Sequence, residues 1–188
     1  INLCSAKSIV LAGDVKQDFG RLNLQEVEEL RDFAQFIKSL GIDIKVVQGN
    51  HDTNLLPYLK PFLIKGYKDH FTLEDILITH GHLALKEELK DPNIKIIICG
   101  HQHPSVSIND EIGVANKFKC TASAKVKDKT LIILPAFSGL KPGVPMNTNP
   151  PEFKKKKKKK SDPDSIEVFI FEEDQWFRFK LKELTLAT

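Results

Sequence analysis

Four groups of metal-capable side chains each follow an apolar run of the chain: Asp14, then Asn50-His51-Asp52, then His80, and finally His101 with His103. A mixture of carboxylate, amide and imidazole groups suits manganese, iron or zinc better than calcium or magnesium. No cysteine belongs to any of the groups, which argues against a structural zinc site of the finger type. A carboxylate such as Asp14 can bridge two cations about 3.5–4 Å apart and offset their repulsion. The residue types therefore predict a site for two divalent transition-metal ions.

The apolar runs before these groups are typical of buried β-strands, as in "SIVLAGD" and "IKIIICGHQH". The carboxyl ends of strands in an α/β sheet converge on a common crevice, so groups far apart in the sequence are expected to meet there. Gly13, Gly49 and Gly100 directly precede three of the groups. A glycine at such a place lets the backbone turn sharply and approach a neighbour closely.

The elements that must position these groups change along the chain. Residues 23–41 have helical spacing of apolar residues, a capping-box pattern in Asn23 and Glu26, and Gly41 as a stop. Residues 70–82 predict a hairpin that ends in His80-Gly81-His82. Five strands are predicted after that, over 105–113, 116–126, 130–137, 165–173 and 176–184. Helices early and strands late favour two packed sheets with helices outside, an α/β sandwich.

The last predicted hairpin is rich in aromatic residues. Trp176 and the alternating phenylalanines are most simply core residues of that hairpin; the phenylalanines are Phe169, Phe171, Phe177 and Phe179. A base-stacking platform for nucleic acid is the alternative interpretation.

Length and composition limit the class of protein. A chain of 188 residues suits one domain with a sizeable core. No apolar run approaches the roughly 20 residues that span a bilayer, and no signal peptide opens the sequence, so we expect no membrane partner. The three cysteines are scattered, which favours a reducing cytoplasm.

Lys154 to Lys160 form an unbroken run of seven lysines. Taking these seven from the 28 basic residues leaves 21 against 25 acidic ones, so the rest of the chain is mildly acidic. Residues 141–165 are dominated by Pro, Asn, Ser and charge, which predicts a flexible, lysine-rich surface loop. The loop is either simply solvated or a contact for nucleic acid or another polyanion.

The motifs "GD", "GNHD", "THGH" and "GHQH", in this order, resemble those of the calcineurin-like metallophosphoesterases, over nearly the whole chain. The segment "LIILPAFSGLKPGV" with a final hairpin is similar, more narrowly, to the ICC-like predicted phosphoesterases common in archaea. The resemblance implies an α/β fold, a two-sheet metallophosphoesterase sandwich flanked by helices. It also implies an enzyme, a metal-dependent hydrolase of phosphoesters, and of phosphodiesters in particular.

Carried over by motif, the resemblance makes Asp14 the carboxylate that bridges both metals. Asn50, His80 and His101 would complete the shell of the second metal, and His103 would bind the first. Manganese is the metal we expect at both positions, with iron or zinc as alternatives.

The resemblance also assigns catalytic roles. His51 would lie beside the scissile phosphate, where it donates to the developing charge or protonates the leaving oxygen, and Asp52 would orient its ring. A metal-bridging hydroxide would attack phosphorus in line, so no Ser or Cys nucleophile is needed. Lys16, Asp18 and His82 could contact the substrate or line the pocket, although solvent-facing loop roles are preferred for Lys16 and Asp18.

The family's first motif, Asp-x-His, is absent, because the 13 residues before Asp14 contain neither Asp nor His. Either the opening strand lies upstream of this chain or the protein has dropped the motif. We expect a weak first metal site, and a chain of low stability because loss of a strand leaves buried backbone groups unpaired. Residues 1–188 are thus predicted to form a single metallophosphoesterase domain, N-terminally incomplete and lacking its first strand.

Three functions compete. The first is the phosphoesterase, acting on a phosphoester substrate, with a nucleotide or nucleic acid as candidates. The second is a non-catalytic interaction scaffold on the same fold, which should have lost His51 or second-site ligands; both are present here. The third is a nucleic-acid-binding protein acting through residues 154–160, whose binding should depend strongly on salt.

Overall fold

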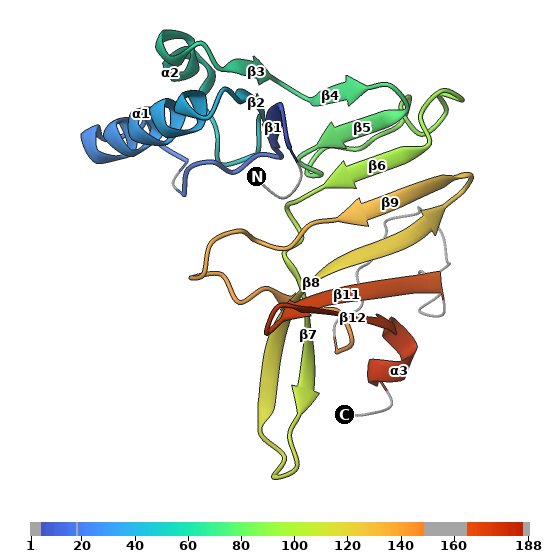
Figure 1. Cartoon of the computed structure of the whole chain (residues 1–188). Coiled ribbons are helices and arrows are strands. Elements are labelled where there is room, and N and C mark those ends of the chain that lie inside the picture. Colours follow the sequence, from blue (N-terminus) through green and yellow to red (C-terminus); the bar gives the residue numbers. More distant parts are fainter. Residues whose placement is uncertain (1–4, 18, 149–164, 186–188) are drawn as a thin grey trace. The chain divides into compact units, whose positions relative to one another are not determined.

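The computed structural model describes residues 5–17, 19–148 and 165–185 (Figure 1). The chain divides into two compact units, Ile1–Lys86 and Glu87–Thr188. The strands of the described residues belong to two sheets, and few helices accompany them there, which confirms the predicted α/β class. In the described segments, no helix combines the length and the apolar character needed to span a membrane.

The first unit is built on a parallel three-stranded sheet in the order β1-β2-β3, with bounds Ser8–Leu11, Asp43–Val47 and Lys65–Tyr67. Helix α1 (Leu24–Ser39) connects the first two strands, and the short helix α2 (Leu56–Leu59) with the 3-10 turn η2 (Lys60–Phe62) leads to the third. The predicted capping box is present at the start of α1: Asn23 Oδ1 accepts from the Glu26 amide at 2.9 Å. The buried face of α1 packs in one cluster with the sheet through Leu30, Ala34 and Ile37.

The predicted hairpin follows in the same unit. Strand β4 (His70–Leu73) pairs antiparallel with β5 (Ile76–Thr79), and Glu74 in the turn adopts a left-handed φ of 54°. Strand β5 leads directly into His80. The end of β1, the end of β2 and the end of β5 therefore each carry one of the predicted site groups.

The second unit is a mostly antiparallel sheet. Its elements are β6 (Ile96–Cys99), β7 (Pro104–Asn109), β8 (Ala115–Val126), β9 (Lys129–Ile133), β10 (Val144–Pro145), β11 (Ile166–Glu172), β12 (Gln175–Lys180) and the helix α3 (Leu181–Thr185). The long strand β8 pairs with β7, β9 and β11, so it joins the parts of this unit. One buried cluster contains Cys99, Cys120, Ile133, Val168 and Leu181 among others.

Two expectations for this unit need correction. The strand predicted over 176–184 ends at Lys180, and the helix α3 takes the remaining residues. The predicted loop at 141–165 is ordered at its start, because β10 pairs in parallel with β7 and Met146 N donates to Ser105 O at 2.8 Å. The lysine run at 154–160 lies outside the described residues.

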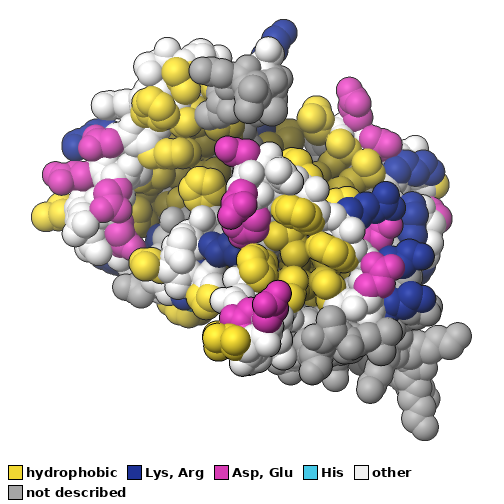
Figure 2. Space-filling model, turned by 60° about the horizontal axis from the view of Figure 1, so that its bottom comes forward, with side chains coloured by type: hydrophobic (Ala, Val, Ile, Leu, Met, Phe, Trp, Pro, Cys, Tyr) yellow, Lys and Arg dark blue, Asp and Glu magenta, His cyan; other side chains and the backbone are white. Residues whose placement is uncertain are grey.

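Large hydrophobic side chains remain exposed on both units, and Figure 2 shows such side chains in yellow beside charged ones. In the last hairpin, Trp176 is 68% exposed and Phe171 is 51% exposed. The interpretation of these aromatic residues as core was therefore wrong for Trp176, Phe171 and Phe177, the last of which is 41% exposed, whereas Phe179 does pack against the buried cluster.

Candidate functional site

The ends of β1 and β2 leave little room around two glycines. Gly13, with a φ of 88°, lies against the His80 ring so closely that a Cβ there would be 2.5 Å from Nδ1. A Cβ on Gly49 would lie 2.2 Å from the Asp14 carboxylate. Side chains of the predicted ligands thus occupy the space that any other residue type at positions 13 and 49 would fill.

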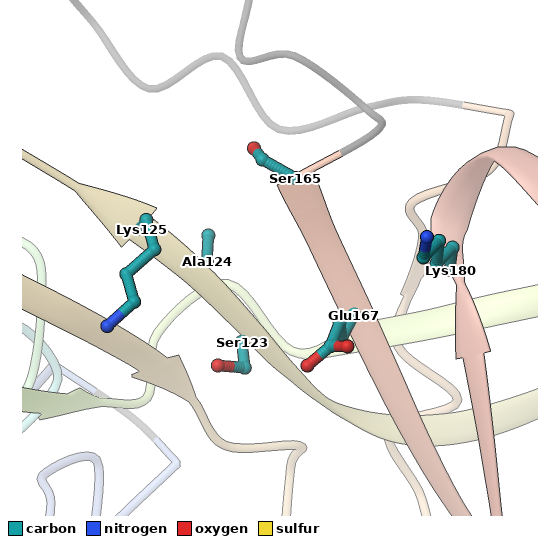
Figure 3. Close-up of a pocket in the computed structure, with 6 residues that line it drawn as sticks. All are labelled: Ser123, Ala124, Lys125, Ser165, Glu167 and Lys180. Atoms are coloured by element: carbon teal, nitrogen blue, oxygen red, sulfur yellow. The ribbon is translucent and has the colours of Figure 1, made fainter.

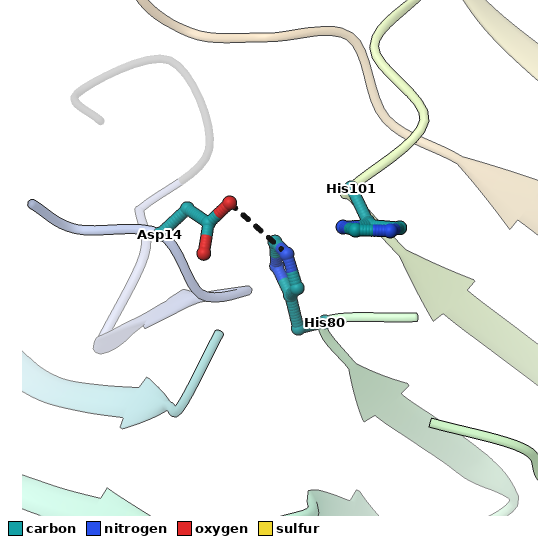
Figure 4. Close-up of side chains that lie close together, drawn as sticks. All are labelled: Asp14, His80 and His101. Carbon is teal, nitrogen blue, oxygen red and sulfur yellow. Dashed lines mark ion pairs between the residues drawn. The ribbon is translucent and has the colours of Figure 1, made fainter. Parts of the chain in front are cut away.

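The Asp14 carboxylate, the Asn50 amide and the His80 imidazole converge within the first unit. His80 Nε2 lies 3.2 Å from Asp14 Oδ2, the ion pair drawn in Figure 4, and 3.1 Å from Asn50 Oδ1. His80 Nδ1 lies 2.8 Å from the carbonyl oxygen of Ala12. A carbonyl oxygen only accepts, so Nδ1 carries a proton and donates it there.

This arrangement fits a metal ion. In the neutral His80 ring with Nδ1 protonated, the Nε2 lone pair faces two acceptor oxygens, which repel it unless a cation or a second proton lies between them. A histidine that donates its second nitrogen to a backbone carbonyl is the usual arrangement of a metal ligand, because this bond fixes the tautomer and the ring orientation. Asp14, His80 and His101 each offer an atom that can coordinate a divalent metal ion.

His51 is held from three sides in the same unit. Its amide donates to Asp14 Oδ1 at 3.0 Å, and its ring Nδ1 lies 2.6 Å from the carbonyl oxygen of Gln17. The ring stacks on Phe19 with centroids 4.0 Å apart and planes 29° apart. Nδ1 therefore carries the proton that it donates to Gln17, and Nε2 is the atom available for proton exchange.

Asp52 has contacts different from those predicted. Its fully buried carboxylate accepts from Val15 N at 2.8 Å, Lys16 N at 3.2 Å and Gly49 N at 2.8 Å. These hydrogen bonds tie the loop after β1 to the loop after β2. Among the described contacts, the His51 ring is oriented by Gln17 and Phe19, so Asp52 organises the two loops instead of the ring.

The remaining predicted residues lie in different surroundings. His101 and His103 follow β6 in the second unit and have left-handed φ values of 65° and 46°. His82 lies beside His80 with ring centroids 5.3 Å apart; burial, and then the neighbouring His80, lower its pKa. Lys16 is buried and its ammonium donates to Gly20 O at 2.8 Å, which corrects the expected solvent-facing role. Asp18 lies outside the described residues.

Comparison with known proteins identifies the family. The profile of the calcineurin-like phosphoesterase superfamily domain matches residues 1–134. The chain belongs to this superfamily. The solved structure of the Pseudomonas putida nuclease MPE aligns with this chain at a TM-score of 0.59 and 13% sequence identity. The alignment covers 92% of this chain and 70% of the nuclease chain, which shows a shared fold. A search of curated proteins found no match.

Sequence reasoning missed three groups of this candidate site. The carbonyl oxygens of Ala12 and Gln17 hold the two imidazoles, and Phe19 stacks on one of them. A backbone acceptor leaves no mark on the sequence, so two of these groups could not have been found. Phe19 did offer a signal, because a large aromatic residue in a short polar loop after "GD" is unusual.

Proposed function

We propose that the chain is a metal-dependent phosphoesterase that hydrolyses phosphodiesters. The observation that carries the proposal is the convergence of Asp14, Asn50 and His80, with the second nitrogen of His80 occupied by the Ala12 carbonyl. The superfamily supports a phosphoester as substrate. The nuclease that shares the fold makes a nucleotide or nucleic acid the substrate class to test first.

Asp14, Asn50 and His80 would hold one divalent cation, and manganese is the ion we propose. By motif, His101 would belong to the same ion, and Asp14 and His103 would hold a second. When bound, such ions neutralise phosphoryl charge and make a water molecule a stronger nucleophile near neutral pH.

The residues around His51 would each have a separate role in catalysis. The Gln17 carbonyl keeps the His51 proton on Nδ1, so Nε2 can hold a second proton and give it to the leaving oxygen. The Phe19 ring limits the motion of the imidazole. Asp52 keeps the loops that carry Asp14 and His51 in a fixed relation through its three backbone hydrogen bonds.

The test is manganese-dependent hydrolysis of a chromogenic phosphodiester beside the matching monoester. We expect faster turnover of the diester, and a loss of about 10²–10⁴-fold in His51→Ala, the range for removal of a general acid. His70→Ala, a change of the same type in β4, serves as the control and should keep its activity. His80→Ala should weaken manganese binding in calorimetry. Bound manganese without turnover of either ester would favour the interaction scaffold.

A further inference from the structure

One face of the strands β8, β11 and β12 is an ordered surface of aromatic and basic residues. The buried side chains Ile166, Val168 and Ile170 belong to the core cluster, so the alternating residues between them point to the opposite face. The register aligns three rows across the strands on that opposite face: Ser123 with Glu167 and Lys180, Thr121 with Phe169 and Arg178, and Phe171 with Trp176. We call this surface the outer hairpin face.

The aromatic row is exposed and arranged for stacking. Trp176 and Phe171 are 68% and 51% exposed, with ring centroids 5.0 Å apart and planes 48° apart. In the next row, the Arg178 guanidinium lies 5.9 Å from the centroid of the Phe169 ring. The exposed rings of Trp176 and Phe171 can accept flat partners on their faces, and a base of any sequence offers such a π-face.

The row at the far end is basic and polar. A shallow pocket there is lined by Ser123, Ala124, Lys125, Ser165, Glu167 and Lys180 (Figure 3). Glu167 forms an ion pair with Arg178, and Glu183 Oε2 accepts from Lys180 N at 2.8 Å. Three cations, Lys125, Arg178 and Lys180, thus stand against these two carboxylates, which leaves a net positive charge at this end. The acidic residues of the hairpin turn, Glu173 and Asp174, lie beyond the aromatic row, at the opposite end. Two residues along a strand advance about 6.6–6.8 Å, so this is the spacing between the aromatic row, the Phe169–Arg178 row and the row of Lys180.

We propose that the outer hairpin face binds single-stranded nucleic acid. Bases stack on Trp176 and Phe171, and the sugar–phosphate backbone runs toward Lys180. Single strands are favoured over a duplex, because only unstacked bases can offer their faces to the rings. A second copy of the chain is the competing occupant, and sedimentation of the protein alone tests it below. The proposal does not rest on the catalytic site.

Trp176 supplies a direct measurement, since it is the sole tryptophan of the chain. The intact chain is titrated in EDTA with an oligothymidylate of about 12 nucleotides, a length within the range that such platforms bind. We expect Trp176 emission to be quenched to saturation, with an affinity that falls as salt rises. Binding detected by anisotropy of a labelled oligonucleotide without quenching would place the nucleic acid elsewhere, on residues 154–160 for example, and overturn the proposal. Equal quenching by a duplex of the same length would also overturn it.

Variants give an independent readout by anisotropy. Phe171→Ala should weaken binding on the order of tenfold, the effect of losing one stacking ring. Lys180→Gln should weaken it and reduce the salt dependence. Phe36→Ala, which removes a ring that is 61% exposed on α1, is the matched control and should bind like the wild type. Circular dichroism checks that each variant is folded. If Trp176 emission instead changes with protein concentration alone, and sedimentation shows a dimer, a second copy occupies the face and the proposal fails.

Discussion

At the scale of single residues, backbone strain coincides with the candidate ligands. Asp14, His101 and His103 all have left-handed φ values, of 54°, 65° and 46°. Such a conformation costs a non-glycine residue about 1–3 kcal/mol and persists only when the surroundings impose it. Each of these residues directly follows the end of a strand or lies within a few positions of it. In the first unit, the sharp turn at Asp14 directs its carboxylate toward His80, whose Nε2 lies 3.2 Å from Oδ2.

Gly49→Ala tests whether the room beside Asp14 matters. A Cβ at position 49 would lie 2.2 Å from Asp14 Oδ1, which also accepts the His51 amide. The carboxylate must move, so we expect manganese affinity to fall by about tenfold or more in calorimetry, since ligands need their supporting contacts. Gly20→Ala is the control, because a Cβ there meets nothing within 4 Å. Unchanged affinity in Gly49→Ala would show that Asp14 does not hold the metal in this position.

At the scale of elements, a side chain extends the sheet of the second unit beyond the short strand β10. Asn147 Oδ1 accepts from Ser107 N at 2.9 Å, and Asn147 Nδ2 donates to Ser107 O at 2.7 Å. Nδ2 also donates to Leu184 O in α3 at 3.2 Å. Asn147 is buried, so these bonds connect β7, the segment after β10 and α3 away from water.

Asn147→Ala should therefore destabilise the second unit. The change removes these hydrogen bonds and leaves backbone groups of Ser107 without their partner, at a cost of about 2–4 kcal/mol. Urea denaturation followed by circular dichroism measures this loss as a lower midpoint. Asn116→Ala is the control, since Asn116 is exposed and its side-chain amide donates to the nearby Val114 O at 3.3 Å. Equal midpoints for both variants would refute the role given to Asn147.

At the scale of the whole molecule, the sequence predicted what periodicity and turn chemistry control. Helix α1 and its capping box, and strands that end in the site groups, followed from apolar spacing and from Asn23, Glu26 and Gly41. The aromatic residues of the last hairpin were all assigned to the core, because the pattern cannot tell which face is covered, so Phe171, Trp176 and Phe177 were misplaced. The contacts of Asp52 with backbone amides and the ordering by Asn147 depend on tertiary neighbours, which local patterns do not encode.

Thiol reactivity reports on the integrity of the second unit as a whole, because its core shields both of its cysteines. Burial raises the pKa of Cys99 to about 11 and that of Cys120 to about 12. In a Cys4→Ser variant at pH 8, we expect neither thiol to react with a thiol reagent until the unit unfolds, and both to react in urea. Unfolded thiols have a pKa of about 8.5, so below that pH the folded and unfolded states both keep these protons. Above it, the unfolded state loses them first, which favours unfolding. The stability of the unit should then fall as pH rises from about 9 toward 11–12. Rapid labelling of either cysteine under native conditions at pH 8 would mean that the core of this unit opens readily.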